Sequence, residues 1–519
     1  MGHGGDGDTG LGRVARGGAV GMAGAAAGAA LNVALVVAVT RAFDQETAGA
    51  FFSATSVFLI VVAVAGLGTP NALVHFTARS RALGAAGRVP ALLRAALGPA
   101  TAVAVLLAGV LAVLADDFAA WLGVPEAATY LRLLAPFLPF AVCMEAALAV
   151  SRGFRDMRAS ALLDKVARPL AQLALLGAVT ASGGAALLAV AWAGPYLPAA
   201  VLAWWWMRRI ARGPAAGPSA DDAGAVVPRP VARRELWSFA LPRSLADIAQ
   251  IGNQRSGIVL VAALRGAADA ALFTAATRFM VVGQFGAQAI QFAVQPRLAE
   301  LLAVGDRDGA NRLYQASTAW LICLAWPLYL LTVVYAPLLL RLFGADYAAG
   351  AEVLVVITLT MLLASGCGMG DLVLMTAGRT SRNLLNNLAS LTVNVALCLL
   401  LVPMWGAVGG ALAWSAAIVL RNLAPIVQLA GSRGLHPWSR AWPLAAGVCL
   451  WWFGAVPLAL QALLGGGVVS LAVALAVGGA GHAVSLWRLR VPLALDGLRA
   501  PLRGRGEAVT STTTRHHVK

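Results

Sequence analysis

Three charged side chains lie inside a long, mostly apolar run at residues 235–265: Arg243, Asp247 and Arg255. A charge near the centre of a lipid-facing helix costs roughly 2.5–3.5 kcal/mol on insertion scales. These side chains are therefore expected to face protein or water. At 100° per residue, one face of the helix collects four polar side chains: Arg243, Asp247, Gln250 and Gln254. A polar face at membrane depth is typical of a cavity lining or a bundle interior.

Two further apolar segments carry stripes of amide side chains at helical spacing. The first stripe consists of Gln284, Gln288, Gln291 and Gln295, and the second consists of Asn383, Asn387, Ser390 and Asn394. Amides donate and accept hydrogen bonds, as a hydroxyl-rich sugar requires, although they could instead bond helix to helix. Two such long stripes favour a hydrated cavity. Asn32, in the first apolar segment, could face the same cavity or bond a neighbouring helix.

Four titratable residues are candidates for gating or coupling. His75 follows Asn71 by one turn and could titrate near neutral pH, or it could be a solvated capping residue. Asp164 and Arg168 are spaced i,i+4, which fits either an ion pair at a helix end or an acid-and-base cluster near the inner mouth of a cavity. Asp371 follows the glycine-rich run 366–370 and could act in ion coupling beside a broken helix, or it could be solvated.

The sequence lacks the patterns that would indicate catalysis. It contains no HExxH, no nucleophile elbow and no Walker A motif, and the GCGMGD run is not followed by GKS or GKT. Each of the five cysteines stands alone in an apolar segment, without metal-binding spacing. We therefore expect no enzyme activity, no cofactor and no metal site. The net charge of +16 does not indicate nucleic acid, because most basic residues are arginines in short loops.

The composition predicts the class of protein that positions these residues. Hydrophobic residues make up 60% of the chain and charged residues 12%, with a mean hydropathy of +0.77, whereas soluble proteins are about 25% charged. We expect an all-α polytopic membrane protein with about 14 transmembrane helices. Each expected span has about 20 residues or slightly more, and they lie near 17–40, 49–71, 92–115, 130–151, 162–182, 185–207, 236–264, 270–295, 315–340, 351–377, 384–402, 406–430, 441–463 and 466–487.

Loop charge predicts the orientation. One set of alternating loops holds nearly all the loop arginines, while the opposite set holds only Arg41, Arg265 and Arg341. By the positive-inside rule, both termini are expected in the cytoplasm and the protein in the cytoplasmic membrane.

A charged, proline-rich linker divides the chain into two sets of six spans, followed by two more. The expected organisation is a cytoplasmic N-terminus, a six-helix bundle, a cytoplasmic linker, a second six-helix bundle, two additional transmembrane helices and a disordered cytoplasmic tail. Their ranges are 1–16, 17–207, 208–235, 236–430, 431–487 and 488–519. We expect no removable signal peptide.

Three stretches resemble the polysaccharide-biosynthesis, or O-antigen, flippases of the MOP exporter superfamily. The first is 28–79, where an Asn, an Arg before a loop, Gly-x-Phe and GLG correspond to Asn32, Arg41, Gly49, Phe51 and 66–68. The others are LFGADYAAG at 342–350 and the run GRTSRNLLNN…GGALAW at 378–414. The resemblance covers most of residues 17–430.

The resemblance implies two pseudo-symmetric six-helix bundles that move a lipid-linked oligosaccharide across the membrane by alternating access. It implies a basic central cavity for the diphosphate, a role assigned here to Arg243, Arg255 and Arg278. The sugar-facing lining would comprise Asn32, Asp247, Gln250, Gln254, Gln284, Gln288, Gln291, Asn387 and Asn394. Two departures stand out. His75 replaces an arginine frequent in relatives, and Ser256 and Gly257 stand where relatives often have an acid.

Other functions remain open at this stage. A lipid II flippase of the same superfamily fits the same pattern. A cation-coupled multidrug antiporter needs a membrane-embedded acid, and no Asp or Glu occurs between Thr9 and Phe43. A non-transporting scaffold would need no polar stripes at membrane depth. The expected partners are the lipid-linked glycan and polysaccharide polymerase or assembly machinery, with no nucleic acid.

Overall fold

The structure is a computed structural model that describes residues 6–182, 184–212 and 233–493. Every regular element in this described part is helical. Large apolar side chains such as Leu106 and Leu463 point outward and are 65% and 80% exposed, which suits a lipid-facing surface. The expected all-α polytopic membrane fold is confirmed.

Ten helices among the described residues precede the linker, joined in places by short 3₁₀ or π-helical segments labelled η. They are α1 (Asp6–Ala42), α2 (Gln45–Ala65), α3 (Thr69–Ala82), η1 (Ala86–Arg88), α4 (Val89–Val113), α5 (Ala115–Trp121), α6 (Ala127–Leu134), η2 (Ala135–Phe137), α7 (Leu138–Gly153), η3 (Ser160–Ala167), α8 (Arg168–Ser182), η4 (Ala185–Leu187), α9 (Leu188–Ala193) and α10 (Tyr196–Arg212).

The helices after the linker include the longest in the molecule as described. They are α11 (Arg233–Arg265), α12 (Ala267–Ala303), α13 (Arg307–Val334), α14 (Ala336–Leu340), η7 (Ala345–Gly350), α15 (Ala351–Gly366), α16 (Gly370–Thr376), α17 (Thr380–Arg433), α18 (Ala441–Leu450), η8 (Trp451–Ala455), α19 (Val456–Leu464) and α20 (Val468–Arg488).

Ten helices among the described residues are long and apolar enough to cross a membrane. The expected spans near 162–182, 236–264 and 270–295 are helical but do not meet this criterion, because charged or polar side chains interrupt their apolar runs. The spans near 384–402 and 406–430 count as one, since α17 is continuous except at Gly406, whose φ of 57° breaks the helical geometry. The count of fourteen stays a prediction.

Glycines mark the other main breaks. α2 ends before a turn in which Leu67 and Gly68 have positive φ, and Pro70 lies in the first turn of α3. The proline is therefore tolerated at a helix start rather than kinking a continuous helix. α15 and α16 are separated at Gly368, which also has positive φ, so the expected break beside Asp371 is present.

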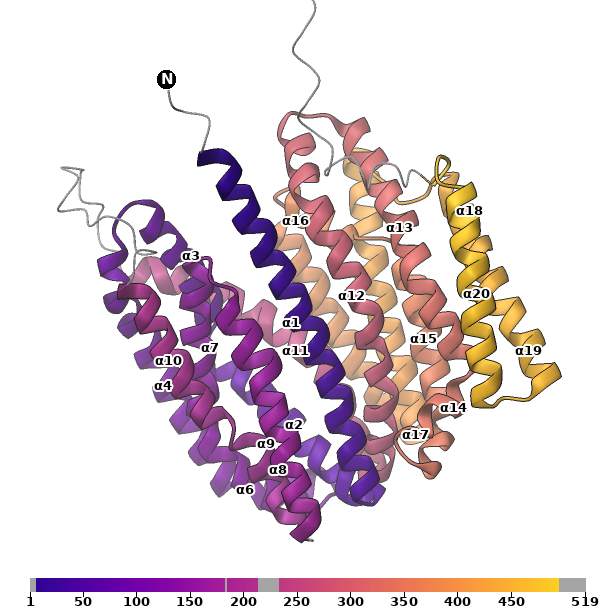
Figure 1. Cartoon of the computed structure of the whole chain (residues 1–519). Coiled ribbons are helices and arrows are strands. Elements are labelled where there is room, and N and C mark those ends of the chain that lie inside the picture. Colours follow the sequence, from indigo (N-terminus) through magenta and orange to yellow (C-terminus); the bar gives the residue numbers. More distant parts are fainter. Residues whose placement is uncertain (1–5, 183, 213–232, 494–519) are drawn as a thin grey trace, which may run out of the picture.

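Figure 1 shows the helices before the linker on one side, those from α12 onward on the other, and α18 to α20 at the outer edge. α1 and α11 lie between these two sides. We call the end where α10 ends and α11 begins the linker end, at the top of Figure 1, and the opposite end the far end. Most of the expected linker 208–235 and tail 488–519, and part of the N-terminus 1–16, lie outside the described residues.

The two sides touch at both ends. At the far end α2 packs on α12, and a Cβ on Gly49 would lie 2.9 Å from the Cα of Ala267. There the Arg41 guanidinium also donates to the carbonyls of Arg341 and Leu342, at 2.9 and 2.8 Å. At the linker end α3 packs on α11. The two sides are therefore joined at both the far end and the linker end.

Candidate functional site

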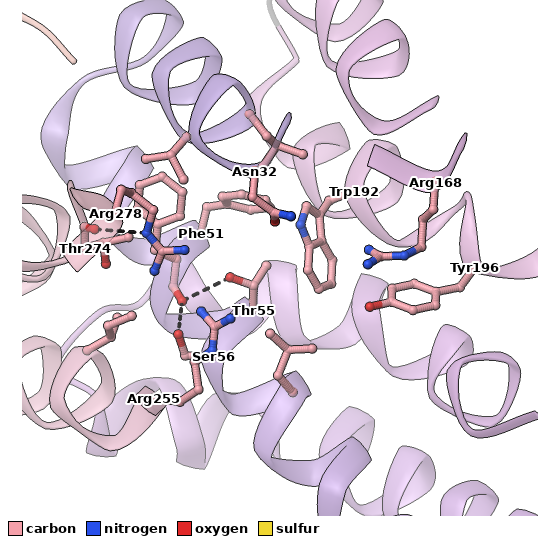
Figure 2. Close-up of a pocket in the computed structure, with 15 residues that line it drawn as sticks. Asn32, Phe51, Thr55, Ser56, Arg168, Trp192, Tyr196, Arg255, Thr274 and Arg278 are labelled. Atoms are coloured by element: carbon pink, nitrogen blue, oxygen red, sulfur yellow. Dashed lines mark hydrogen bonds between the residues drawn. The ribbon is translucent and has the colours of Figure 1, made fainter. Parts of the chain in front are cut away.

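The central cavity lies between these two sets of contacts and has a volume of about 240 Å³. Its walls come from seven helices: α1, α2, α8, α9, α10, α11 and α12. Arginine, aromatic and hydroxyl side chains from these helices point into it (Figure 2). Its labelled lining residues are Asn32, Phe51, Thr55, Ser56, Arg168, Trp192, Tyr196, Arg255, Thr274 and Arg278.

Three arginines from different helices contribute the positive charge. Arg168 donates to the Asp164 carboxylate at 2.9 Å, and its guanidinium lies 4.9 Å from the centre of the Tyr196 ring. Arg278 donates to the Thr274 carbonyl at 3.2 Å and to the Thr277 hydroxyl at 3.3 Å. Among the described residues, Arg255 has neither a hydrogen-bond partner nor an ion-pair partner. It is the guanidinium best placed to bind an incoming group.

The balance of charge in the cavity is positive. No Asp or Glu is among its lining residues, and Asp164 lies directly behind Arg168. Guanidinium groups at partly desolvated positions attract anions strongly, and their fork of donors matches phosphate and carboxylate oxygens. The cavity is therefore suited to an anionic group.

Three further polar side chains of the lining donate to backbone carbonyls. The Asn32 amide donates to the Gly28 carbonyl at 2.7 Å, and the Thr55 and Ser56 hydroxyls donate to the Phe52 carbonyl. Their oxygens are left free to accept from a hydroxyl of a ligand.

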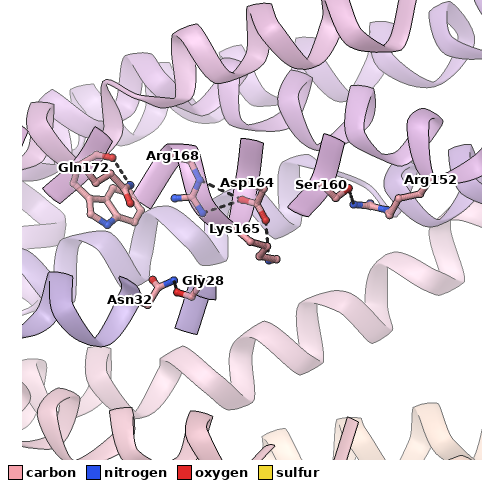
Figure 3. A network of polar contacts seen from close by, with 9 residues as sticks. Gly28, Asn32, Arg152, Ser160, Asp164, Lys165, Arg168 and Gln172 are labelled. Carbon is pink, nitrogen blue, oxygen red and sulfur yellow. Dashed lines mark hydrogen bonds and ion pairs between the residues drawn. The ribbon is translucent and has the colours of Figure 1, made fainter. Parts of the chain in front are cut away.

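A buried polar cluster supports Arg168 from behind (Figure 3). The Asp164 carboxylate binds both Arg168, at 2.9 Å, and Lys165, at 2.7 Å. These residues belong to or directly follow the π-helix η3, against which α1 packs closely at Gly24 and Gly28. The cluster fixes one of the three cavity arginines.

Glu145 on α7 joins this cluster electrostatically and was missed by the sequence analysis. It interacts with Asp164, Arg152, Lys165 and Arg168. The signal was available, because Glu145 is an isolated acid in an apolar run and such residues are expected to face protein.

Comparison with known families decides what kind of protein holds this cavity. The sequence profile described as "Polysaccharide biosynthesis protein" matches residues 14–302, more than half of the chain. The chain belongs to this family. A second profile, MatE, matches residues 242–400. No protein of curated function matches the chain in sequence.

Several solved structures share the fold of this polysaccharide biosynthesis protein. "Lipid II flippase MurJ, inward closed conformation" aligns with a TM-score of 0.69 and 11% identity over 90% of this chain and 98% of that one. An inward-facing multidrug resistance MATE family transporter of the MOP superfamily gives 0.62 and 17% over 78% and 93%. A MOP superfamily transporter from Pyrococcus furiosus gives 0.53 and 17% over 81% and 95%. The profile match identifies a member of the polysaccharide-biosynthesis family, and these structures show that its fold is shared by transporters of the MOP superfamily.

The predicted site residues of this family member divide between several places. Arg255, Arg278, Asn32 and Arg168 line the central cavity. Arg243 and Asn387 line a second pocket nearer the linker end. Asn394 is fully buried and donates to the Ser256 hydroxyl at 3.1 Å, bonding α17 to α11.

Other predicted residues lie outside both pockets. Five glutamines are exposed and line neither pocket: Gln250, Gln254, Gln284, Gln288 and Gln291. Asp247 accepts from the Asn71 amide at 2.7 Å, and the His75 ring stacks on Phe239 with centroids 4.6 Å apart. Asp371 accepts from Arg421 at 3.2 Å.

Proposed function

We propose that this protein is a flippase that moves a polyprenyl-diphosphate-linked oligosaccharide from the cytoplasmic to the outer leaflet for exopolysaccharide or O-antigen assembly. The observation that carries the proposal is the central cavity with three arginines, in which, among the described residues, no acid lines the walls and Arg255 has no partner. A diphosphate supplies the negative charge that these guanidinium groups need, and the polyprenyl tail stays in the bilayer.

The arrangement of helices supports alternating access. The cavity lies between two sides that touch at both ends, so opening one end at a time would expose it to one leaflet at a time. We propose the two six-helix bundles 17–207 and 236–430 as the moving bodies, with 431–487 carried by the second. The arginine-rich linker end is assigned to the cytoplasm by the positive-inside rule, and a polysaccharide polymerase is the expected downstream partner.

Two related functions are the alternatives. A lipid II flippase would use the same basic cavity, and the MurJ structure shares the fold. A cation-coupled multidrug antiporter would have the MATE fold, but its cargo is positively charged and this cavity repels cations.

The deciding experiment deletes the gene and measures lipid-linked glycans on each leaflet. Accumulation on the cytoplasmic leaflet, loss of surface polysaccharide and survival of the cells support the proposal. Loss of viability with accumulated lipid II indicates the first alternative. Unchanged glycan lipids together with sensitivity to cationic drugs indicate the antiporter.

A further inference from the structure

A second pocket, of about 330 Å³, lies at the linker end between α11, α16 and the start of α17. We call it the linker-end pocket. It shares no lining residue with the central cavity. Its polar lining residues are Ser238, Arg243, Thr380, Ser381, Asn383 and Asn387. It is large enough for one sugar, because its volume is at the low end of small-ligand sites.

Two side chains that line this pocket carry buried amide oxygens that have no donor among the described residues. Asn387 is only 8% exposed, and its amide nitrogen donates to the Asn383 carbonyl at 3.0 Å. Because a carbonyl can only accept, this bond fixes which way the Asn387 amide points. Its oxygen, like that of Asn383, has no partner among the described residues. Buried acceptors normally have donors, and sugar hydroxyls would supply them.

The electrostatics of the pocket favour a negative group. Arg243 has no hydrogen bond or ion pair among the described residues, and its guanidinium lies 5.5 Å from the centre of the Phe239 ring. The first residues of α17 line the pocket, and no side chain caps that helix start. Its free N–H groups and dipole add positive potential.

The carboxylate of Asp247, near the pocket, already has a hydrogen-bond partner. Among the described residues no Asp or Glu lines the pocket, and Asp247, one turn along from Arg243, accepts from Asn71 on α3. A bare cation would meet Arg243 and the positive end of α17. The arrangement suits a ligand with several hydroxyl donors and one anionic group.

We propose that the linker-end pocket binds an acidic sugar of the cargo, with its hydroxyls on Asn383 and Asn387 and its carboxylate on Arg243 and the start of α17. This inference rests on the proposed function for the identity of the cargo. Arg243 and Arg255 lie roughly 18 Å apart along α11, from its rise per residue. A diphosphate and a short oligosaccharide together span that distance, so one cargo molecule occupies both sites.

The test uses the purified full chain in lipid nanodiscs, with thermal unfolding midpoints measured against glucuronate, glucose and inorganic pyrophosphate. Bound ligand raises the midpoint by mass action. Glucuronate should stabilise both the native protein and the Arg255→Gln variant. It should bind at least about tenfold more weakly to Arg243→Gln. It should also bind more weakly to Asn387→Leu. Pyrophosphate should show the opposite preference, stabilising Arg243→Gln but not Arg255→Gln.

Three results would overturn the inference. These are equal stabilisation by glucose and glucuronate, no stabilisation by glucuronate, and an unchanged response in Arg243→Gln. Arg243 is exposed, so that variant remains informative if Asn387→Leu misfolds. The pocket would be a cation site instead if sodium chloride, but not choline chloride, raised the unfolding midpoint and if this effect disappeared in Asn387→Leu. If glucuronate behaves as expected but pyrophosphate does not bind, the pocket assignment stands and the diphosphate assignment fails.

Discussion

Arg255 differs from the other cavity arginines in having no protein partner among the described residues. Arg168 is held by Asp164 and Arg278 by Thr274 and Thr277. Removing Arg255 therefore leaves no protein group unpaired, and its loss should affect cargo binding more than folding. A hydrogen bond to a charged group contributes about 1.5–3 kcal/mol.

Arg255→Gln should consequently lower polysaccharide export roughly 10- to 100-fold. The measurement is surface polysaccharide in a strain that carries the variant as its sole copy, normalised to the protein in the membrane. Arg297→Gln is the matched control, because Arg297 is exposed and, among the described residues, pairs only with Glu300, at 2.9 Å. Normal export in Arg255→Gln would remove this residue from the binding site.

Unlike Arg255, Asp164 should matter more for the stability of the fold than for cargo binding. Asp164→Asn leaves Arg168 and Lys165 without their carboxylate, and breaking a buried pair from one side costs about 3–5 kcal/mol. The thermal unfolding midpoint should fall clearly. The double variant Asp164→Asn, Arg168→Gln should recover part of this loss, and a loss that is simply additive would argue against the pairing.

The sequence predicted which single charged residues face protein, but it predicted less well which of them share a pocket. Arg255 and Arg278 stand out because an isolated charge in an apolar helix must face protein. Arg243 shares a helix with Arg255 but belongs to another pocket, since twelve residues of helix separate them along the axis. The glutamine stripe on α12 shows that its residues share a face, but periodicity does not tell what that face meets. Asn394 could not be assigned without knowing that Ser256 lies opposite.

At the scale of elements, the close approach of α2 to the start of α12 controls the far end. A Cβ on Gly49 would overlap the backbone of Ala267, and backbone cannot move aside cheaply. Overpacking of this kind typically costs about 1–3 kcal/mol. Gly49→Val should therefore shift the protein roughly 5- to 150-fold toward a state open at the far end and stop transport.

Spin labels at Glu46→Cys and Asp346→Cys in a cysteine-free background would report this opening as a longer distance. The matched control is Gly109→Val on α4, because a Cβ there meets nothing within 4 Å. An unchanged distance in Gly49→Val would mean that this contact does not close the far end.

Local sequence predicted the positions of helices better than the residues at which they end. Apolar runs predicted most helices, and the glycines at 366–370 predicted one break, beside Asp371. The GLGTP run at 66–70 could not show that α2 ends before Pro70, because that depends on Gly68 packing against the Ala240 backbone of α11. Contacts between distant segments decide such positions.

In the whole molecule, contacts between α3 and α11 join the two sides at the linker end. Arg79 binds Glu235 at 2.6 Å, His75 stacks on Phe239, and Asn71 binds Asp247 at 2.7 Å. We call these three pairs the linker-end latch. An exposed ion pair contributes only about 0–1 kcal/mol, so the latch is weak enough to open during transport.

Alternating access requires that the latch open in every cycle. A short, reducible cross-linker between Asn71→Cys and Asp247→Cys should therefore stop export, and reductant should restore it. The same cross-link between Asn386→Cys and Gln428→Cys joins two helical runs within one side, where the native amides bond at 2.9 Å, and it should leave export intact. Full export with a completely cross-linked latch would show that α3 and α11 stay together, and cargo would then have to enter the central cavity by another route.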